Sequence, residues 1–138
     1  MLKKRSDCPI SCSLEIFGDK WTLLILRDVM LRGKSSYGEF LQSEEKISTN
    51  ILADRLSLLE TEEFLTKRVS PQNKSKFIYS LTKKGIDLLP IIIEIMAWGA
   101  KYNPECPKKE IGKRLPHEKE EVVKEYTQKL ENQFEKES

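Results

Sequence analysis

The sequence predicts a mainly α-helical fold with one small β-hairpin, an α+β class. Apolar residues recur at helical spacing along most of the chain, and 33% of the 138 residues are charged against 38% apolar, as in helix-rich globular proteins. Only residues 64–81 contain two short runs of bulky and β-branched residues around a turn-forming segment. The length suffices for one domain with an ordinary core and an accessory helix.

Two helices are expected at the start of the chain. Residues 11–17 have helical character, and Gly18 interrupts them. Asp19 is a suitable N-cap for residues 20–31, whose broad apolar face is typical of a central helix contacted from several sides. The Arg-Gly-Lys sequence of residues 32–34 ends this second helix.

A pair of helices follows. A short helix over residues 37–42, capped by Ser35 or Ser36, is separated by a polar turn from a longer helix over residues 49–62. Ser48 is the expected N-cap of the longer helix, because its hydroxyl can accept from a free backbone N–H of the first turn.

The next segments predict a β-hairpin. Residues 64–69 and 77–81 have strand character, and residues 70–75 between them are rich in turn formers. A two-helix unit followed directly by a β-hairpin is the winged helix-turn-helix arrangement. The order of elements therefore predicts that fold.

The last part of the chain is expected to be helical with one interruption. Thr82 caps a strongly apolar helix over residues 83–101, which Pro90 should bend. Residues 103–116 contain proline and glycine and are expected to break regular structure. Residues 118–135 form a final helix whose narrow apolar stripe is typical of packing on another helix, in the same chain or in a second subunit.

Local charge points to DNA, although the net charge is only +2. From Phe64 to Ile86 there are six basic residues and no acidic one, and Lys74 and Lys76 lie at the predicted hairpin tip. Such a hairpin can lie along phosphates, although lysines also keep sheet edges from pairing. Because the hairpin follows a helix-turn-helix unit, we favour contact of these basic residues with DNA over a purely solvent-exposed sheet edge.

The helix over residues 49–62 is the candidate recognition helix, because such helices present their N-terminal residues to base edges. Ser48, Thr49 and Asn50 are short hydrogen-bonding residues at that end, where the helix N-terminus also favours a phosphate. Arg55 lies further along and can reach a base or phosphate, or form a salt bridge with the neighbours of Asp54 or with Glu62. Ser48 can cap the helix while backbone amides contact DNA.

No enzyme, metal or cofactor is expected. The single histidine, His117, falls in the polar break, and no phosphate-binding glycine loop or serine–histidine–acid set is present. Cys8, Cys12, Cys106 and His117 could in principle supply four zinc ligands, but their spacing is not a standard one. The Cys-x-x-x-Cys spacing also argues against a thiol oxidoreductase.

The chain is expected to be cytoplasmic and to have no membrane partner. The basic start is not followed by the apolar stretch of a secretory signal. The most apolar run, residues 88–100, is too short to span a bilayer and contains Glu94.

Cys8 is the candidate reactive thiol. Pro9 suits the first position of a helix, which makes Cys8 the N-cap at the positive helix end. The basic residues 3–5 also favour the thiolate, whereas Asp7 opposes it. Cys12 lies one turn inside the helix and is expected to pack, and a Cys8–Cys12 bond would distort the first turn. A passive Cys8 is the alternative; if Cys8 does form a disulfide, a cysteine of another subunit or a small thiol is the better partner.

Several blocks carry a family resemblance, in order along residues 8–102: Cys8-Pro-Ile, Gly18-Asp-Lys-Trp-Thr-Leu-Leu-Ile-Leu-Arg27, Phe40, Ile47-Ser48, Leu52, Arg55-Leu56, Leu59-Glu60, Tyr79-Ser-Leu-Thr, Gly85 and Trp98-Gly99. Together they resemble the HxlR family of bacterial winged-helix transcriptional regulators. The Gly-Asp-Lys-Trp and Tyr-Ser-Leu-Thr blocks are the most specific.

The resemblance implies a homodimer that binds a palindromic operator in double-stranded DNA. Residues 1–102 would form the winged helix-turn-helix domain with dimerisation helices, and residues 103–138 the break and an amphipathic helix of the same unit or of the dimer interface. DNA contact is implied for Ser48, Thr49, Asn50, Arg55, Lys74 and Lys76. The dimer interface is expected to involve Leu14, Phe17, Leu88, Ile92, Ile95 and Trp98.

Some members of the family sense electrophiles or oxidants through a cysteine at the position of Cys8. The resemblance therefore implies that a small-molecule electrophile or an oxidant can act on this chain through Cys8. A regulator with a different small-molecule effector or none, and a winged-helix protein–protein module, are the alternatives. The family usually has glycine where this chain has Glu63, so the end of the candidate recognition helix is expected to be strained or to differ. Cys12 and Cys106 are not general features of the family.

Overall fold

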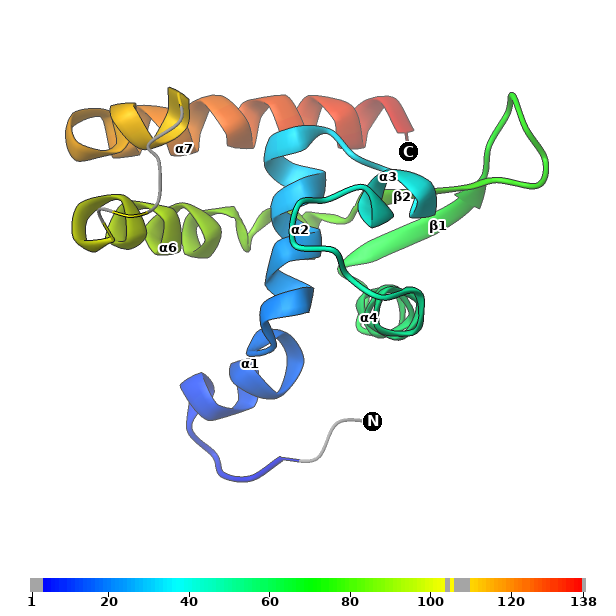
Figure 1. Cartoon of the computed structure of the whole chain (residues 1–138), viewed down its shortest axis with the longest axis horizontal. Helices are drawn as coiled ribbons and strands as arrows, with labels where there is room; N and C mark the ends of the chain where they lie inside the picture. Colours follow the sequence, from blue (N-terminus) through cyan, green and yellow to red (C-terminus); the bar gives the residue numbers. More distant parts are fainter. Residues whose placement is uncertain (1–3, 104, 106–109, 138) are drawn as a thin grey trace. The chain divides into compact units, whose positions relative to one another are not determined.

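The structure is a computed structural model that describes residues 4–103, 105 and 110–137 (Figure 1). The chain forms two compact units, Met1–Thr82 and Lys83–Ser138. The elements in chain order are α1 (Pro9–Phe17), α2 (Lys20–Arg32), α3 (Tyr37–Leu41), α4 (Thr49–Thr61), β1 (Leu65–Val69), β2 (Phe77–Leu81), α5 (Lys83–Ile86), α6 (Leu89–Tyr102) and α7 (Glu110–Glu137). The predicted helix-rich fold with one hairpin is confirmed. Cys106 lies outside the described residues.

Helix α2 is the central helix of the first unit. The Asp19 carboxylate caps it by accepting a hydrogen bond from the Thr22 N–H at 3.0 Å. Gly33 ends it in the left-handed conformation, with φ of 65°, which glycine adopts without steric penalty. Six of its thirteen residues are buried, as the broad apolar face predicted: Thr22, Ile25, Leu26, Asp28, Val29 and Met30.

The caps expected for α3 and α4 are both present. Ser36 and Glu39 form a capping box around the start of α3, and the Ser48 hydroxyl accepts from the Ile51 N–H at 3.2 Å. Leu52, Leu56 and Leu59 bury the inner face of α4. Both helices contact one another, and α4 also contacts α2 and β1.

Helix α4 ends in a Schellman motif that contains no glycine. The Phe64 N–H donates to the Leu59 carbonyl at 2.8 Å, and the Glu63 N–H donates to the Glu60 carbonyl at 3.0 Å. Glu63 lies between them with φ of 65°, a conformation that disfavours any residue with a Cβ. The strain expected from the sequence at this position is therefore present.

Strands β1 and β2 pair antiparallel, with Leu65 opposite Leu81 and Lys67 opposite Tyr79. Leu65, Tyr79 and Leu81 are buried, whereas Val69 and Phe77 at the outer end are exposed. The hairpin thus has an apolar root in the core and an open outer end (Figure 1).

The second unit differs from the prediction in two places. A single helix bent at Pro90 was expected, but α5 ends at Ile86 and Pro90 lies in the first turn of α6, where its missing N–H is tolerated. The interruption expected up to residue 116 is also wrong for residues 110–116, which belong to α7; the chain kinks instead at Glu118. Helices α6 and α7 pack against each other. Among the described residues, no helix is both long and apolar enough to cross a membrane.

Candidate nucleic-acid interface

The N-terminal end of α4 presents three exposed polar residues, Ser48, Thr49 and Asn50. Ser48 caps the helix with its hydroxyl, so its side chain already has one partner. From α3, the Tyr37 hydroxyl donates to the Thr49 carbonyl at 3.1 Å, which ties the start of α4 to α3. The remaining N–H groups of this turn give the end a partial positive charge suited to a phosphate.

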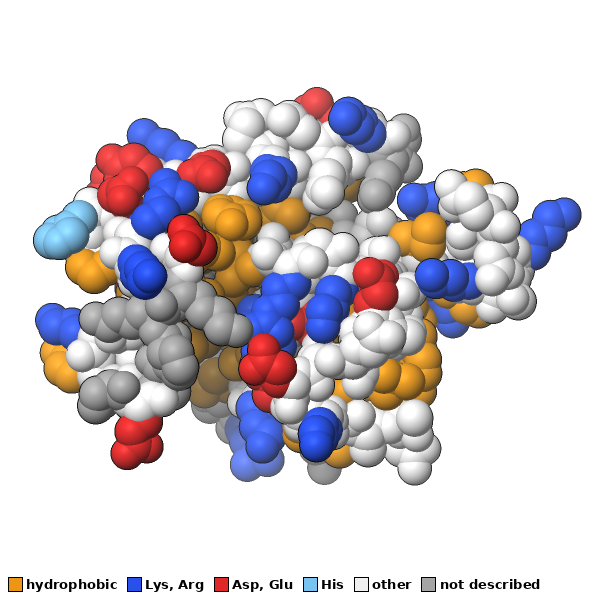
Figure 2. Space-filling model, turned by 45° about the horizontal axis from the view of Figure 1, so that its top comes forward, with side chains coloured by type: hydrophobic (Ala, Val, Ile, Leu, Met, Phe, Trp, Pro, Cys, Tyr) orange, Lys and Arg blue, Asp and Glu red, His pale blue; other side chains and the backbone are white. Residues whose placement is uncertain are grey.

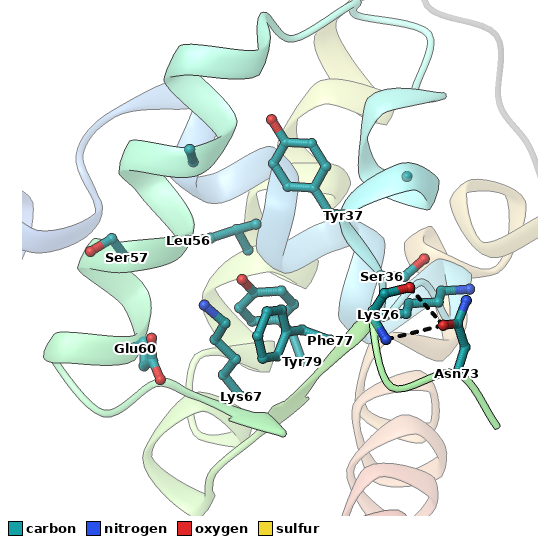
Figure 3. Close-up of a pocket in the computed structure, with 13 residues that line it drawn as sticks. Ser36, Tyr37, Leu56, Ser57, Glu60, Lys67, Asn73, Lys76, Phe77 and Tyr79 are labelled. Carbon is teal, nitrogen blue, oxygen red and sulfur yellow. Dashed lines mark hydrogen bonds between the residues drawn. The ribbon is translucent and has the colours of Figure 1, made fainter. Parts of the chain in front are cut away.

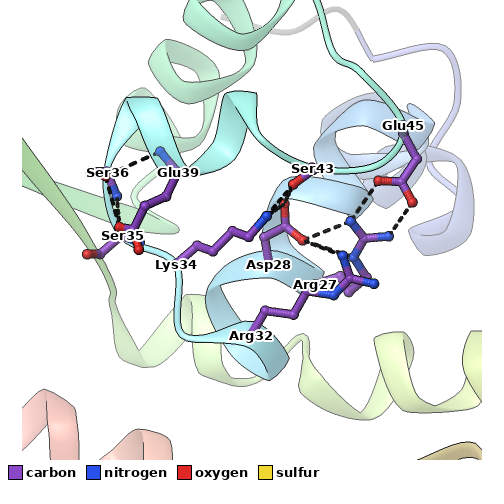
Figure 4. A network of polar contacts seen from close by, with 9 residues as sticks. All are labelled: Arg27, Asp28, Arg32, Lys34, Ser35, Ser36, Glu39, Ser43 and Glu45. Carbon is purple, nitrogen blue, oxygen red and sulfur yellow. Dashed lines mark hydrogen bonds and ion pairs between the residues drawn. The ribbon is translucent and has the colours of Figure 1, made fainter. Parts of the chain in front are cut away.

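A polar network holds the turn that leads into α4 (Figure 4). Asp28 of α2 is only 2% exposed, and it accepts hydrogen bonds from Arg27 at 2.8 and 3.1 Å and from the Ser43 hydroxyl. Lys34 donates to Ser43 at 2.7 Å. A buried carboxylate is stable only when such partners surround it, so Asp28 fixes this turn against α2.

The same network reaches Glu45, two residues before the buried Ile47 and three before the cap of α4. The Arg27 guanidinium donates to both Glu45 oxygens at 2.8 and 2.9 Å, a bidentate pair. These hydrogen bonds lower the pKa of Glu45 to about 2. The sequence shows Asp28 only as one more residue on a helical face, and its partners lie up to 15 residues away, so pattern analysis missed this network.

Arg55 is engaged within the first unit. Its guanidinium donates to Asp19 at 2.8 and 3.3 Å and to Asp54 at 2.6 Å. The hydrogen bond from Arg55 is the main cause that lowers the pKa of Asp19. Asp19 therefore caps α2 and anchors α4 at the same time. Arg55 thus forms a salt bridge, the kind of role considered as the alternative, but with Asp19 and Asp54, which the sequence did not indicate as its partners. Its contact with DNA stays a prediction.

The basic hairpin projects from the first unit. Lys74 and Lys76 are exposed at its tip, as expected, and Lys67 and Arg68 are exposed on β1. Figure 2 shows lysine and arginine side chains around this projecting hairpin, at the right of the view. Two hydrogen bonds between Ser75 and Asn73 shape the tip: the Ser75 N–H and hydroxyl both donate to the Asn73 side-chain oxygen. Such a tip can approach a phosphate backbone.

Cys8 is the N-cap of α1, as predicted, and is exposed. Its side chain makes no capping hydrogen bond, yet the backbone N–H groups of Ser11 and Ile10 lower the pKa of the thiol. The basic neighbours contribute less than the sequence suggested, because Lys4 pairs with Asp7 at 2.6 Å and Arg5 with Glu15 at 2.7 Å.

Cys12 is half-buried, and its thiol donates to the Ser6 carbonyl at 3.2 Å. The two thiols therefore have different surroundings. Within the part of the chain that the structure describes, no cluster of histidine, cysteine and acidic residues could hold a metal ion, and His117 is exposed.

The residues expected at a dimer interface differ in how exposed they are in the single chain. Leu14 on α1 and Ile95 and Trp98 on α6 are exposed by 54%, 51% and 62%, so they are open to a partner. Phe17 is half-buried, whereas Leu88 and Ile92 are buried in the chain itself.

The sequence analysis missed two members of the exposed stripe on α6. Ile91 and Tyr102 are also exposed, and together with Ile95 and Trp98 they follow the spacing i, i+4, i+7, i+11. The sequence contains that spacing, but α6 is apolar on nearly all sides. The sequence alone therefore did not reveal which face of the helix stays exposed to solvent.

Comparisons with known proteins agree with this architecture. Residues 16–107 match the family model described as HxlR-like helix-turn-helix. The chain is 33% identical over 107 residues to YdeP of Bacillus subtilis (strain 168), named an uncharacterized HTH-type transcriptional regulator, covering 78% of this chain and 83% of YdeP. It is 32% identical over 96 residues to the HTH-type transcriptional regulator YodB of the same strain, covering 69% and 85%.

Solved structures give the same result. The reduced form of YodB aligns with a TM-score of 0.57 at 30% identity, covering 74% of this chain and 100% of that one. The redox regulator HypR in its oxidized form aligns with a TM-score of 0.62 at 30% identity, covering 70% and 98%. The family and the winged-helix fold expected from the sequence are confirmed. The chain belongs to the HxlR-like helix-turn-helix family and is a transcriptional regulator rather than an enzyme.

Proposed function

We propose that the protein is a homodimeric regulator that binds a palindromic operator and changes its DNA affinity when Cys8 is oxidised or alkylated. The observation that carries DNA binding is the exposed end of α4 next to a hairpin region without acidic residues. Ser48, Thr49 and Asn50 supply donors and acceptors for base edges, and Lys74 and Lys76 supply charge for phosphates.

Dimerisation is supported by the exposed apolar stripe of α6. Large side chains at Ile91, Ile95, Trp98 and Tyr102 form a surface of the kind that marks protein interfaces. A two-fold dimer places two copies of α4 on half-sites about one DNA turn apart. A small rotation between subunits then misaligns one half-site and weakens binding.

The chemistry at Cys8 follows from its thiolate. A hydroperoxide takes two electrons from the thiolate sulfur, which becomes a sulfenic acid as the O–O bond breaks and an alcohol or water leaves. A second thiol then displaces water from the sulfenic acid and forms a disulfide. An electrophile instead forms a carbon–sulfur bond directly. The exposed position and the lowered pKa of Cys8 support this role, as do relatives named as redox regulators.

A mobility-shift titration against DNA from upstream of the protein's own gene tests the proposal. Reduced and diamide-treated protein are expected to differ at least ~5-fold in affinity, the usual lower size of a coupled response. The Cys8→Ser variant should lose this difference, and Cys12→Ser is the matched control that should keep it. An equal response of Cys8→Ser and wild type excludes Cys8 as the sensor, and no binding at low salt excludes the DNA function.

Salt dependence tests the hairpin separately. Replacing Lys74 or Lys76 by alanine is expected to reduce the salt slope of binding by ~1 each, because each lysine releases about one counterion. Lys124→Ala on exposed α7 surface is the control. Unchanged slopes for both tip variants remove the hairpin from the interface.

A regulator without thiol sensing is the second candidate. The pairing of Lys4 with Asp7 and of Arg5 with Glu15 favours it, because only the helix end then activates Cys8. The Cys8→Ser titration separates the two candidates.

A further inference from the structure

A cavity of about 620 Å³ lies between α3, α4 and the hairpin, within the first unit (Figure 3). Its size is in the range of small-molecule sites. Its walls are mixed: Tyr37 and Leu56 are apolar or aromatic, Glu60 is acidic, and Lys76 is basic. The proposed DNA contacts at the start of α4 do not line this space, whereas Lys76, a proposed phosphate contact of the hairpin, does.

Lys67 and Tyr79 form the floor together with Phe77. Lys67 and Tyr79 are directly opposite in the β1–β2 register, so their side chains leave the same face of the hairpin. Phe77 lies two residues from Tyr79 and therefore shares that face. The Lys67 ammonium lies 4.2 Å from the centre of the Phe77 ring. Among the described residues, Lys67 makes no ion pair with a carboxylate.

The Tyr79 hydroxyl is the second polar group of the floor. Tyr79 is only 8% exposed, and its ring packs edge-on against Phe40 at 6.3 Å. The hydroxyl has no hydrogen-bond partner among the described residues, and Figure 3 shows it pointing toward α4 on the cavity side. Burial, and then the charge of Glu60, raise the pKa of Tyr79, so the hydroxyl remains a donor. No fully buried side-chain oxygen or nitrogen of the described residues lacks a hydrogen-bond partner, so this unpartnered hydroxyl is open to an acceptor that enters the cavity.

We propose that this cavity binds a small aromatic carboxylate. The carboxylate accepts from the Tyr79 hydroxyl and from the Lys67 ammonium, and the ring of the ligand lies against Phe77, Leu56 and Tyr37. A carboxylate fits because one group then pairs with both donors. An aromatic ring fits because the surrounding rings offer faces and edges for stacking. Lys67 and Lys76 outnumber Glu60, so the charge of the lining also favours an anion.

Calorimetric titration of the full-length protein with benzoate, without DNA, tests the inference independently of the proposed function. Benzoate is expected to bind with a Kd of ~10 mM or tighter, the range for a ligand of this size. Tyr79→Phe and Lys67→Met should each weaken binding ~10-fold, since each removes a hydrogen bond to a charged group. Tyr79→Phe deletes a hydroxyl without a partner, so the fold is expected to survive, which circular dichroism checks.

Matched variants and ligands make the result specific. Tyr126→Phe and Lys124→Met, both on α7, repeat the same changes outside the cavity lining and should leave benzoate binding unchanged. Benzamide and cyclohexanecarboxylate should bind ~5-fold or more weakly than benzoate, because they lack the charge and the aromatic ring respectively. The inference is overturned if benzoate does not bind, if Tyr79→Phe binds like wild type, or if inorganic phosphate binds as well as benzoate.

Discussion

Replacing Glu63 by glycine should stabilise the protein. Glu63 has φ of 65° at the end of α4, and a residue with a Cβ pays ~1–2 kcal/mol there. Glycine removes that penalty but adds ~0.5–1 kcal/mol of unfolded-state entropy. The expected net gain in the free energy of unfolding is therefore ~0.5–1 kcal/mol, or a few degrees in Tm.

The surrounding hydrogen bonds should survive the change, because they use the backbone. The Glu63 N–H donates to Glu60, and the Glu63 carbonyl accepts from the Thr82 hydroxyl at 2.6 Å. Urea unfolding followed by far-UV circular dichroism measures the gain, and an unchanged m-value would show that the unfolded state is the same.

Two further variants separate backbone strain from side-chain effects. Glu63→Ala removes the carboxylate but keeps the Cβ, so it should stay within ~0.5 kcal/mol of wild type. Gly33→Ala places a Cβ at the same φ of 65°, where nothing lies within 4 Å, and should cost ~1 kcal/mol. The reasoning is refuted if Glu63→Gly is no more stable than Glu63→Ala.

Three other outcomes are expected. Asp28→Ala should lose ~3–5 kcal/mol in urea unfolding, because it leaves cations of the network without their buried partner; a loss under ~1 kcal/mol would contradict this. The pKa of Glu45 is about 2 in the folded protein, against the ordinary value of 4.5 in the unfolded chain. The stability that this carboxylate contributes is therefore complete above pH ~4.5 and is lost as the pH falls toward ~2. Because the side chain is 34% exposed, solvent screening reduces this contribution to ~1 kcal/mol. Acid unfolding of Glu45→Gln should lack this component, and an identical pH profile would count against the Arg27 pair. Iodoacetamide should label Cys8 faster than Cys12 at neutral pH, measured by peptide mass spectrometry, and equal rates would contradict the effect of the helix end.

Local chemistry made the first unit predictable from the sequence. The Asp19 and Ser48 caps, the glycine end of α2 and the limits of the hairpin depend on residues within a few positions of each other. At Glu63, where the family usually has glycine, the sequence indicated either strain or a different helix end, and the left-handed conformation shows that strain is present. Signals of this range are what a single sequence carries best.

Features that depend on distant residues were not predictable. Asp28 lies on an apolar helix face and accepts a hydrogen bond from Ser43, 15 residues further along the chain. The sequence alone does not show that these two residues meet. Ile92 and Ile95 look alike in sequence, yet one is 6% exposed and the other 51%, because α6 is apolar around most of its circumference. Pro90 was interpreted as a bend although it also suits the first turn of a helix, and periodicity does not distinguish the two.

The way α4 is held has a consequence for which of its residues can be substituted. The residues that position this helix, Asp19 with Arg55 and the cluster around Asp28, are separate from the exposed polar residues at its start. Thr49 and Asn50 can therefore change without disturbing these supports, whereas a change at Asp28 disturbs the turn that leads into α4 and with it the proposed DNA contacts at the start of this helix. Such a division separates the residues that hold α4 in place from those proposed to read an operator, so recognition can be changed at a few surface positions of this chain without loss of the fold.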